Sequence, residues 1–572
     1  MAVAGSPPKT RDRTRLFPIV GWIKSYDRRW LRGDLIAGVA VAALIVPKNL
    51  GYAGIAGVPL QNGLYAAAAG ALLYPIFGTS RQISTGPSSG IAAVAASAVA
   101  AAAITGIDSI AQFVALITLA SGVLFLLLAV LKMGWVAQFL SRAVVTGFLF
   151  GAAIDVVIGE LPKLTGTEVS GANPLQELRS WVLSLGSTHR PTLVVGMIGL
   201  LVIFGLRAVA PRVPGALVLV VGGLLASRLF DLAARGVALV GDVPSGLPAL
   251  DLPDVQMFTS HAETVVLAAI GLVLIGFSQT AGDSRAFAAR HRYRIDIDQE
   301  SVAQGMANVG AGVFQGMPVS TSLSASSLND RSGARSGVAS LVTGVIVLLT
   351  LIFLAPLFSD LPTAVLGALI IEAVVGGMMD VPEMRRLARV QRFDFWIACA
   401  ALAGALVFGV FAGVLIGIGL SLIWLISVAT RPGMPLIGRD PASHVFQELG
   451  PGDETFPGIV ILRLDGGLFF ATADALEDRI REVALSSEEV DAVIVDFVAV
   501  DYIDSQGGSK MREILELAKQ SEVMLRLARV KPDVLELLAR DGFVEQLGAD
   551  RIHDGIRQAV AAQLPGGEAS LR

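Results

Sequence analysis

The sequence predicts a polytopic α-helical membrane protein with fourteen spans, followed by a small cytoplasmic α/β domain. Three observations lead to this prediction. The 572 residues are 53% hydrophobic and only 16% charged, whereas soluble domains carry about 25% charged residues. The mean hydropathy is +0.67, and apolar runs of the length that crosses a bilayer follow one another up to residue 429. Beyond this point the composition becomes that of a soluble domain.

The apolar runs give the expected spans, if short or broken runs are allowed. They lie near residues 34–53, 62–78, 86–104, 109–131, 136–158, 191–209, 214–232, 262–282, 300–316, 318–329, 336–355, 363–379, 393–410 and 411–429. Each even-numbered span is followed by Arg or Lys, as the positive-inside rule requires for cytoplasmic loops when the basic N-terminus is also inside. We therefore expect a cytoplasmic segment 1–33 without a cleaved signal, a transport domain 34–430, a linker 431–457 and an α/β domain 458–565.

Two spans are interrupted by glycine, proline and hydroxyl residues. These interruptions lie at 78–90 near the third span and at 316–329 near the tenth. Spans 3 and 10 correspond to each other if the membrane part consists of two halves of seven spans, and an odd number makes the halves inverted. Two half-helices whose N-termini face each other would offer unpaired N–H groups and two positive dipole ends, which form an anion site. The alternative is that both segments are re-entrant packing kinks.

The expected anion ligands are polar residues of the first span and of the two half-helix starts. They are Lys48, Tyr52, Thr85, Gly86, Ser88, Ser89, Ser320, Thr321, Ser322 and Ser324. Lys48 follows Pro47 and lies about 20 Å of helix from the start of its span. This depth favours a lysine inside the membrane, although it could alternatively snorkel to the interface.

The C-terminal part alternates strand and helix patterns. Strands are expected at 459–464, 468–471, 492–497 and 523–528, and helices at 474–483, 505–519, 531–540 and 554–563. This alternation predicts one small sheet covered by helices.

Several stretches resemble the SulP family of anion transporters, which includes sulfate permeases and prestin. In the membrane part they are Asp34–Gly38 with 46–53 and 62–65, the segment 78–87, and 316–329 with 333–335. In the tail, 500–507 is similar to the strand-to-helix signature of a STAS domain. The resemblance implies two inverted sets of seven spans arranged as core and gate bundles, like those of uracil permease, and a homodimer.

The chain departs from the family pattern at several of these positions. Most relatives have glutamine where Lys48 stands and arginine where Ala325 stands. The resemblance therefore implies that the positive charge has moved, with one fixed cation near the two helix ends in both arrangements. Many relatives have a carboxylate at the position of Gln279, used for coupling ions. Asp283 lies four residues later on the same helical face and could bind a proton or Na⁺; alternatively it pairs with Arg285 or Lys48, or caps the helix.

Glu372 in the twelfth span is a further coupling candidate, unless it only packs or bonds within the gate. The STAS-like motif reads Asp504-Ser505-Gln506-Gly507, with one hydroxyl where bacterial relatives that use a serine as phosphate acceptor have two. Its helix start could bind an anion or a nucleotide phosphate, but structural docking is favoured.

The function that this resemblance implies is secondary active transport of small inorganic anions, sulfate first, across the cell membrane by alternating access. The alternatives are bicarbonate or dicarboxylate transport, nucleobase–proton symport on the same fold, or a regulatory receptor with vestigial transport. One cysteine and five scattered histidines predict no metal site, and no cofactor is expected beyond a coupling H⁺ or Na⁺. The sequence has no nucleophile elbow, phosphate loop or HExxH motif, so we expect no enzyme. The expected partners are the anion, membrane lipid and a second copy, and no nucleic acid.

Overall fold

The computed structural model describes residues 17–134, 141–171, 174–210, 213–247, 250, 252–485 and 490–571. The chain forms two compact units, Met1–Ser421 and Leu422–Arg572, and each is described by itself. The start of the expected span 136–158 lies outside the described residues.

Each expected span corresponds to a helix in the described part of the chain. The helices are α3 (Leu31–Ala56), α4 (Leu60–Phe77), α5 (Ser89–Ala101), α6 (Ile107–Val130), α7 (Arg142–Thr165), α9 (Arg190–Val209), α10 (Gly215–Leu229), α12 (Ala262–His291), α13 (Ile297–Val313), α14 (Leu323–Arg331), α15 (Val338–Phe353), α16 (Thr363–Gly377), α18 (Arg392–Phe408) and α19 (Val410–Ala429). Among the described residues, seven helical stretches are long and apolar enough to cross a membrane, and α5, α10 and α15 are shorter apolar helices. The interrupted spans, α5 and α14, are the half-helices that their proline and hydroxyl residues predicted.

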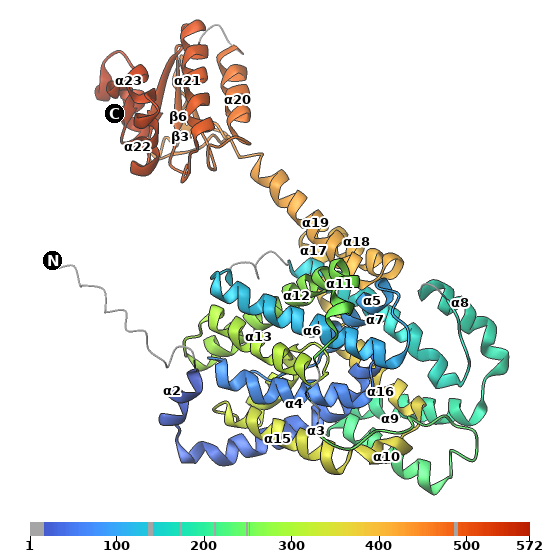
Figure 1. Ribbon diagram of the computed structural model, residues 1–572. Helices are drawn as coiled ribbons and strands as arrows, with labels where there is room; N and C mark the ends of the chain where they lie inside the picture. The colour runs from blue at the N-terminus through green and yellow to red at the C-terminus, as the bar shows by residue number, and fades with distance from the viewer. Residues whose placement is uncertain are drawn as a thin grey trace. The chain divides into compact units, whose positions relative to one another are not determined.

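The membrane unit consists of two helix bundles. Helices α3–α6 pack with α12–α15 in a core bundle, while α7, α9 and α10 pack with α16 and α18 in a gate bundle (Figure 1). Each bundle takes consecutive helices from both halves of the chain, which is the arrangement of an inverted repeat. Small residues allow these helices to approach closely: a Cβ added to Gly147 of α7 would lie 2.2 Å from the carbonyl oxygen of Ala398 in α18.

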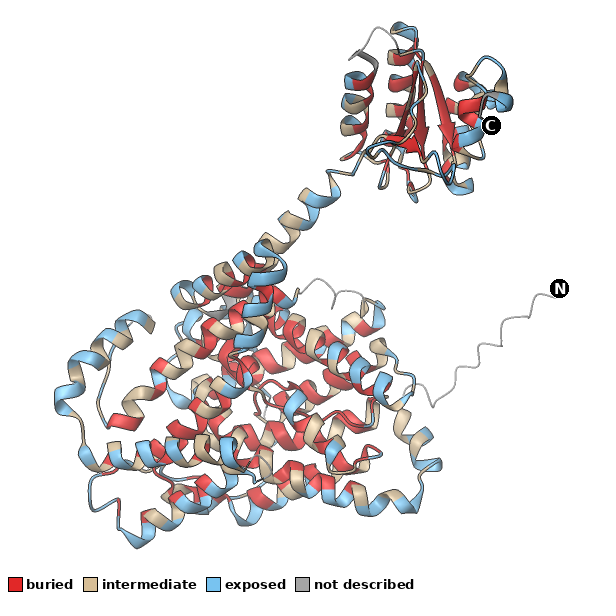
Figure 2. Cartoon of the chain, turned by 180° about the vertical axis from the view of Figure 1, so that it is seen from behind, coloured by how far each residue is buried: buried red, intermediate tan, exposed pale blue. Residues whose placement is uncertain are grey.

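Shorter helices precede the first span or connect later ones. They are α2 (Pro18–Lys24), α8 (Pro174–Ser184), α11 (Val255–Ser260) and α17 (Val381–Val390). Buried residues concentrate inside the bundles, where the helices face one another (Figure 2).

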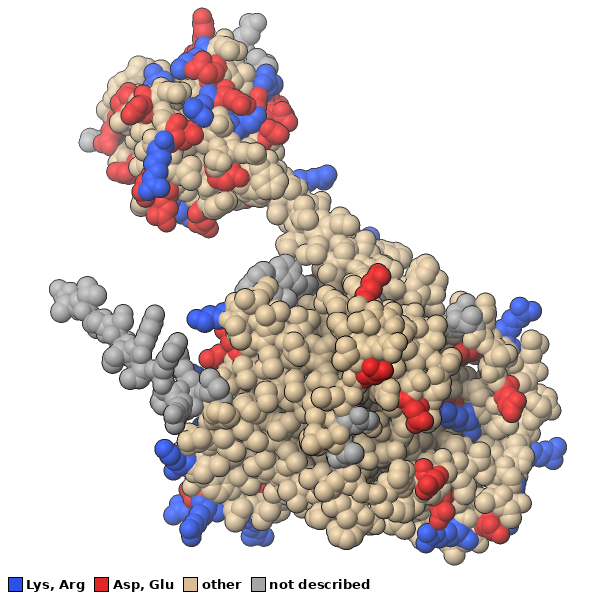
Figure 3. Space-filling model, in the orientation of Figure 1, with Lys and Arg blue, Asp and Glu red and all other residues tan. Residues whose placement is uncertain are grey.

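The C-terminal unit contains a parallel sheet in the order β5-β6-β7-β8, formed by Ile459–Arg463, Ala492–Asp496, Met524–Ala528 and Ile552–His553. Helices α20 (Ala473–Leu485), α21 (Ser505–Gln520), α22 (Pro532–Arg540), α23 (Phe543–Leu547) and α24 (Ile556–Ala561) surround it. A short hairpin of β3 (Ile437–Arg439) and β4 (Phe446–Glu448) precedes it. The unit has its own apolar core, and its surface is dense in charges that are sparse on the membrane unit (Figure 3).

One strand prediction in this unit is wrong. The apolar run 468–471 does not form a strand; Leu468 makes only an isolated parallel bridge with Ile503, and a turn follows. Leu468 is buried while Phe470 is 66% exposed. The apolar character of the run reflects the burial of Leu468 in the core, and the run does not add a strand to the sheet.

Candidate functional site

Two very short strands bring the half-helices together. β1 (Thr85–Gly86) and β2 (Ser320–Thr321) pair antiparallel, with Thr85 opposite Thr321 and Gly86 opposite Ser320. α5 begins three residues after β1, and α14 begins two residues after β2. The pairing therefore holds both helix N-termini next to each other inside the core bundle. The start of α5 has no side-chain cap, while at α14 the Ser322 hydroxyl accepts from the N–H of Ala325 at 3.4 Å.

A small cavity lies between these helix starts and α3. It is lined by Lys48, Asn49 and Tyr52 of α3 and by residues around the two breaks, which include Ser84, Thr85, Gly86, Pro87, Ser322, Ser324 and Ala325. The fold thus brings together six of the ten expected ligands: Lys48, Tyr52, Thr85, Gly86, Ser322 and Ser324. Ala325 is 2% exposed and lines the same cavity as Lys48.

Three donor groups at this cavity lack a partner within the described residues. Lys48 makes no side-chain hydrogen bond or ion pair there, and Asn49 Nδ2 and Thr85 Oγ1 are buried without a hydrogen-bond partner. Buried donors are normally satisfied, so unsatisfied ones at a cavity indicate a place for an acceptor. Asn49 is not among the expected ligands. The sequence feature that could have indicated it is an amide side chain next to Lys48 inside an apolar run.

The four remaining expected ligands do not line this cavity. Ser88 Oγ lies 3.3 Å from Ser320 Oγ, and Ser320 Oγ donates to Gln279 Oε1 at 3.0 Å. Thr321 Oγ1 donates to Asp283 Oδ2 at 3.4 Å. These contacts place Gln279 and Asp283 directly behind β2.

Ser89 faces elsewhere, since its Oγ is 3.6 Å from the position of a Cβ on Gly377 of α16. Within the described residues Asp283 makes no ion pair with Arg285 or Lys48, so the pairing alternative does not hold in this conformation.

Glu372 lines another cavity, which lies between the core and gate helices and has a volume of about 290 Å³. Its Oε1 lies 3.1 Å from Arg207 Nη1. Lys48, Arg207, Glu372 and Leu328 all line this cavity, so Lys48 borders both spaces. Sequence reasoning missed Arg207, because a residue 165 positions from Glu372 gives no local sign of the pairing.

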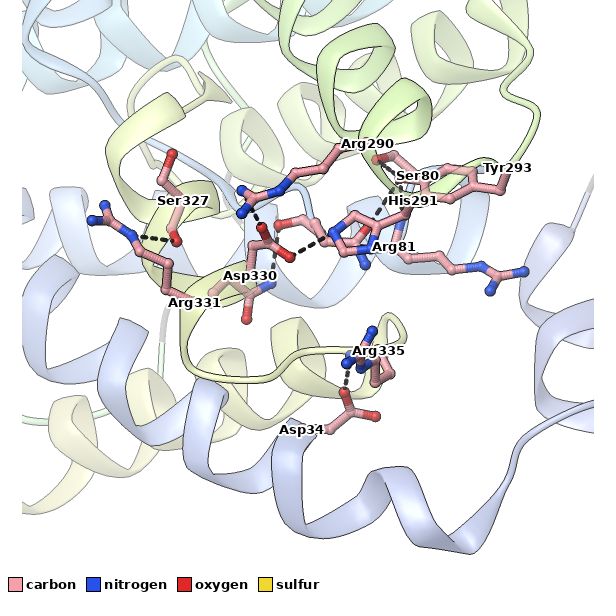
Figure 4. A network of polar contacts seen from close by, with 12 residues as sticks. Asp34, Ser80, Arg81, Arg290, His291, Tyr293, Ser327, Asp330, Arg331 and Arg335 are labelled. Carbon is pink, nitrogen blue, oxygen red and sulfur yellow. Dashed lines mark hydrogen bonds and ion pairs between the residues drawn. The ribbon is translucent and has the colours of Figure 1, made fainter.

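The basic loops assigned to one side of the membrane meet at one end of the core bundle (Figure 4). Asp330 at the end of α14 accepts hydrogen bonds from Arg290 at 2.8 Å and is 2.7 Å from His291. The buried Asp34 accepts from the backbone N–H of Arg335 at 2.6 Å. These contacts join α3, α12 and α14 at the end where the positive-inside rule gathers the arginines.

The STAS-like signature forms a helix start that is already capped. Asp504 Oδ1 accepts from the N–H of Gly507 at 2.7 Å, and its Oδ2 accepts from the N–H of Phe470 at 3.1 Å. A carboxylate at the N-terminus of α21 competes with any anion there, which favours the docking interpretation over anion binding.

A membrane bundle of two inverted halves, whose broken helices meet beside a lysine and unsatisfied donors, defines the class of membrane transporters for anions. Residues 31–401 match the model of the Sulfate permease family, and residues 451–559 match the STAS domain. The chain belongs to the sulfate permease family and carries a STAS domain at its C-terminus. It is therefore a transporter and not an enzyme.

Known proteins are similar to this chain over its whole length or over its membrane part. A probable sulfate transporter of Mycobacterium tuberculosis is 33% identical over 558 residues, which are 95% of this chain and 97% of that protein. The solved structure of the murine Solute Carrier 26 family member A9 anion transporter, in the inward-facing state, has a TM-score of 0.86 at 20% identity and covers 96% of this chain and 94% of its own. The transmembrane domain of the cyanobacterial bicarbonate transporter BicA has a TM-score of 0.61 at 21% identity and covers 69% of this chain and 98% of its own. The two structures support the fold.

Proposed function

We propose that the protein is a secondary active transporter of small inorganic anions, with sulfate as the principal substrate, which works by alternating access. The anion is bound between the N-termini of α5 and α14, and Lys48 provides the fixed positive charge. The antiparallel pairing of β1 and β2 carries this proposal, because it aims two helix starts at one cavity. The relative from Mycobacterium tuberculosis, named a probable sulfate transporter, supports the choice of substrate.

The chemistry of the lining supports an anion over a cation or a nucleobase. Lys48, Asn49 Nδ2 and Thr85 Oγ1 are all donors without a partner in the described part of the chain. A sulfate offers four acceptor oxygens and no donor, so its chemistry is complementary to these groups. Lys48 also borders the larger cavity, so an anion that enters between core and gate meets the same cation before it reaches the helix starts.

The experiment measures anion affinity and selectivity in proteoliposomes, with sulfate, bicarbonate, chloride, dicarboxylates and uracil as competitors. Lys48→Gln should weaken sulfate affinity by roughly 100-fold or more, because removing one partner from a desolvated charge pair costs about 3 kcal/mol or more. Lys48→Gln with Ala325→Arg should regain part of this loss, since position 325 lines the same cavity.

Lys24→Gln is the matched control. It removes the same charge, but Lys24 is exposed on α2. Unchanged affinity in Lys48→Gln removes Lys48 from the site, and competition by uracil instead of sulfate assigns the other substrate class.

We further propose that both termini are cytoplasmic, in the plasma membrane, in a homodimer whose segments follow the boundaries 1–33, 34–430, 431–457 and 458–565. The clustering of Arg81, Arg290, Arg331 and Arg335 at one end of the core supports this orientation. Labelling of single cysteines introduced at Ser443 and Gly186 of a Cys399→Ala variant, in intact cells, tests it. Only the cysteine at position 186, in the loop between spans 5 and 6, should react with a membrane-impermeant reagent.

A further inference from the structure

An apolar groove lies on the gate bundle and shares no lining residue with the candidate anion site. It has a volume of about 740 Å³, within the range of pockets that hold organic ligands. Helices α9 and α10 form its walls and Val365 of α16 lies at its floor. In the most apolar window of α9 only 22% of the residues are buried, so this hairpin presents most of its apolar surface outward.

Glycine creates the groove. A Cβ added to Gly223 would lie 3.0 Å from Val365, which lets α10 approach α16 closely. A Cβ added to the neighbouring Gly222 would meet nothing within 4 Å. Position 222 is therefore open space that a larger side chain could fill without displacing the protein.

Two arginines stand at one end of this apolar groove. Arg190 is the first residue of α9 and Arg235 follows α10, and the antiparallel hairpin puts these positions at the same end. The contact of His189 with Gly236 agrees, since a Cβ on Gly236 would lie 3.4 Å from the His189 ring.

Neither guanidinium has an ion-pair partner within the described residues. By contrast, Arg207 on α9 pairs with Glu372 and Arg228 on α10 pairs with Asp360 at 2.9 Å. Arg190 and Arg235 are thus two positive charges at the end of an apolar groove, and no acid among the described residues pairs with them.

We propose that this groove is a binding site for an anionic phospholipid, whose acyl chain lies between α9 and α10 and whose phosphate is held by Arg190 and Arg235. An acyl chain matches the apolar lining of the groove, which includes Val194, Ile198 and Leu219. A phosphate matches guanidinium groups, which bind it with paired hydrogen bonds. A second copy of the chain would have to supply acids to both arginines from an apolar helix surface, so the charge pattern favours the lipid.

The test is native mass spectrometry of the purified full-length protein with phosphatidylglycerol or phosphatidylcholine. The wild-type protein should retain phosphatidylglycerol about 30-fold more strongly than phosphatidylcholine, since each basic residue near an anionic headgroup contributes about one factor of five. Arg190→Gln with Arg235→Gln should abolish this preference. Gly222→Leu should remove the bound lipid with both arginines in place.

The controls are Arg179→Gln, an exposed arginine of α8 outside the groove, and Gly205→Leu on α9, whose added Cβ also meets nothing within 4 Å. Both should retain phosphatidylglycerol as the wild type does, and gel filtration verifies that every variant is folded. Equal retention of the two lipids, or unchanged retention in Gly222→Leu, would overturn the proposal. A change in oligomeric state with Gly222→Leu and unchanged lipid binding would assign the groove to a second copy.

Discussion

Single charged side chains inside the membrane unit differ in whether the fold gives them a partner. Glu372 is paired with Arg207, while Lys48 and Asp283 have no ion-pair partner in the described residues. An ionised group inside a bilayer is expensive and normally marks a pathway or a coupling site. Asp283 contacts β2 through Thr321 and is therefore connected to the proposed anion site without lining it.

Asp283→Asn should abolish accumulation of anion against its gradient and leave exchange or downhill flux. The reason is that the coupling cation would lose its carboxylate, while the proposed ligands lie on the other side of β2. Uptake driven by a proton or Na⁺ gradient, compared with equilibrium exchange in the same liposomes, measures both. Asp155→Asn removes an acid from α7 of the gate and should leave coupling intact. Full concentrative uptake by Asp283→Asn would make Glu372→Gln the next variant to test.

Individual helices depend on the close approach that glycine permits. Gly147→Ala should lower the stability of the solubilised protein by about 1–3 kcal/mol, because its Cβ would overlap the carbonyl of Ala398 and force α7 away from α18. Gly159→Ala on the same helix meets nothing within 4 Å and should be neutral or stabilising. Thermal unfolding in detergent compares the two, and equal stability would mean that α7 and α18 tolerate a wider spacing.

The final strand of the STAS unit contains a titratable group whose environment opposes its charge. Burial, followed by the nearby Arg526, lowers the pKa of His553 below its usual 6.5, and Arg526 Nη1 is 3.1 Å from His553 Nε2. As the pH falls below 6.5 the unfolded chain takes up the proton first. The contribution of neutral His553 to the stability of this unit is therefore fully present above pH 6.5. It is lost as the pH falls through the pKa that His553 has in the folded unit.

His553→Gln should reduce the loss of thermal stability of the isolated C-terminal unit between pH 7.5 and 5.5. The exposed His444 provides the control, and His444→Gln should change stability with pH as the wild type does. An identical pH dependence in His553→Gln and the wild type would contradict this account.

The whole molecule is divided between a membrane unit that holds every proposed anion ligand and a C-terminal unit with its own core. A separate domain can change transport only through a difference in docking energy between conformational states, typically about 1–3 kcal/mol or roughly 5–150-fold. Truncation after Arg431 should therefore change rate or expression within that range and leave anion selectivity unchanged. Competition profiles of full-length and truncated protein measure this, and a reordered substrate preference would show that the tail shapes the site.

The sequence by itself determined the class, the fourteen helices, the two broken spans and the soluble α/β tail. Each of these features depends on residues that are close together in the sequence. The length of an apolar run determines a span, proline with hydroxyl residues interrupts it, and alternating strands and helices indicate a covered sheet. Lys48 could be proposed as a ligand because a lysine directly after a proline inside an apolar run is exceptional.

Only the tertiary structure decided which polar residues share a cavity. Both Thr85 and Ser88 precede α5, yet Thr85 lines the cavity and Ser88 contacts Ser320. Arg207 forms an ion pair with Glu372. Leu468 packs into the core of the C-terminal unit and makes only an isolated bridge there. The physical reason is that these contacts join residues that are distant along the chain, 165 positions apart for Arg207 and Glu372. Local periodicity does not determine which faces will pack together.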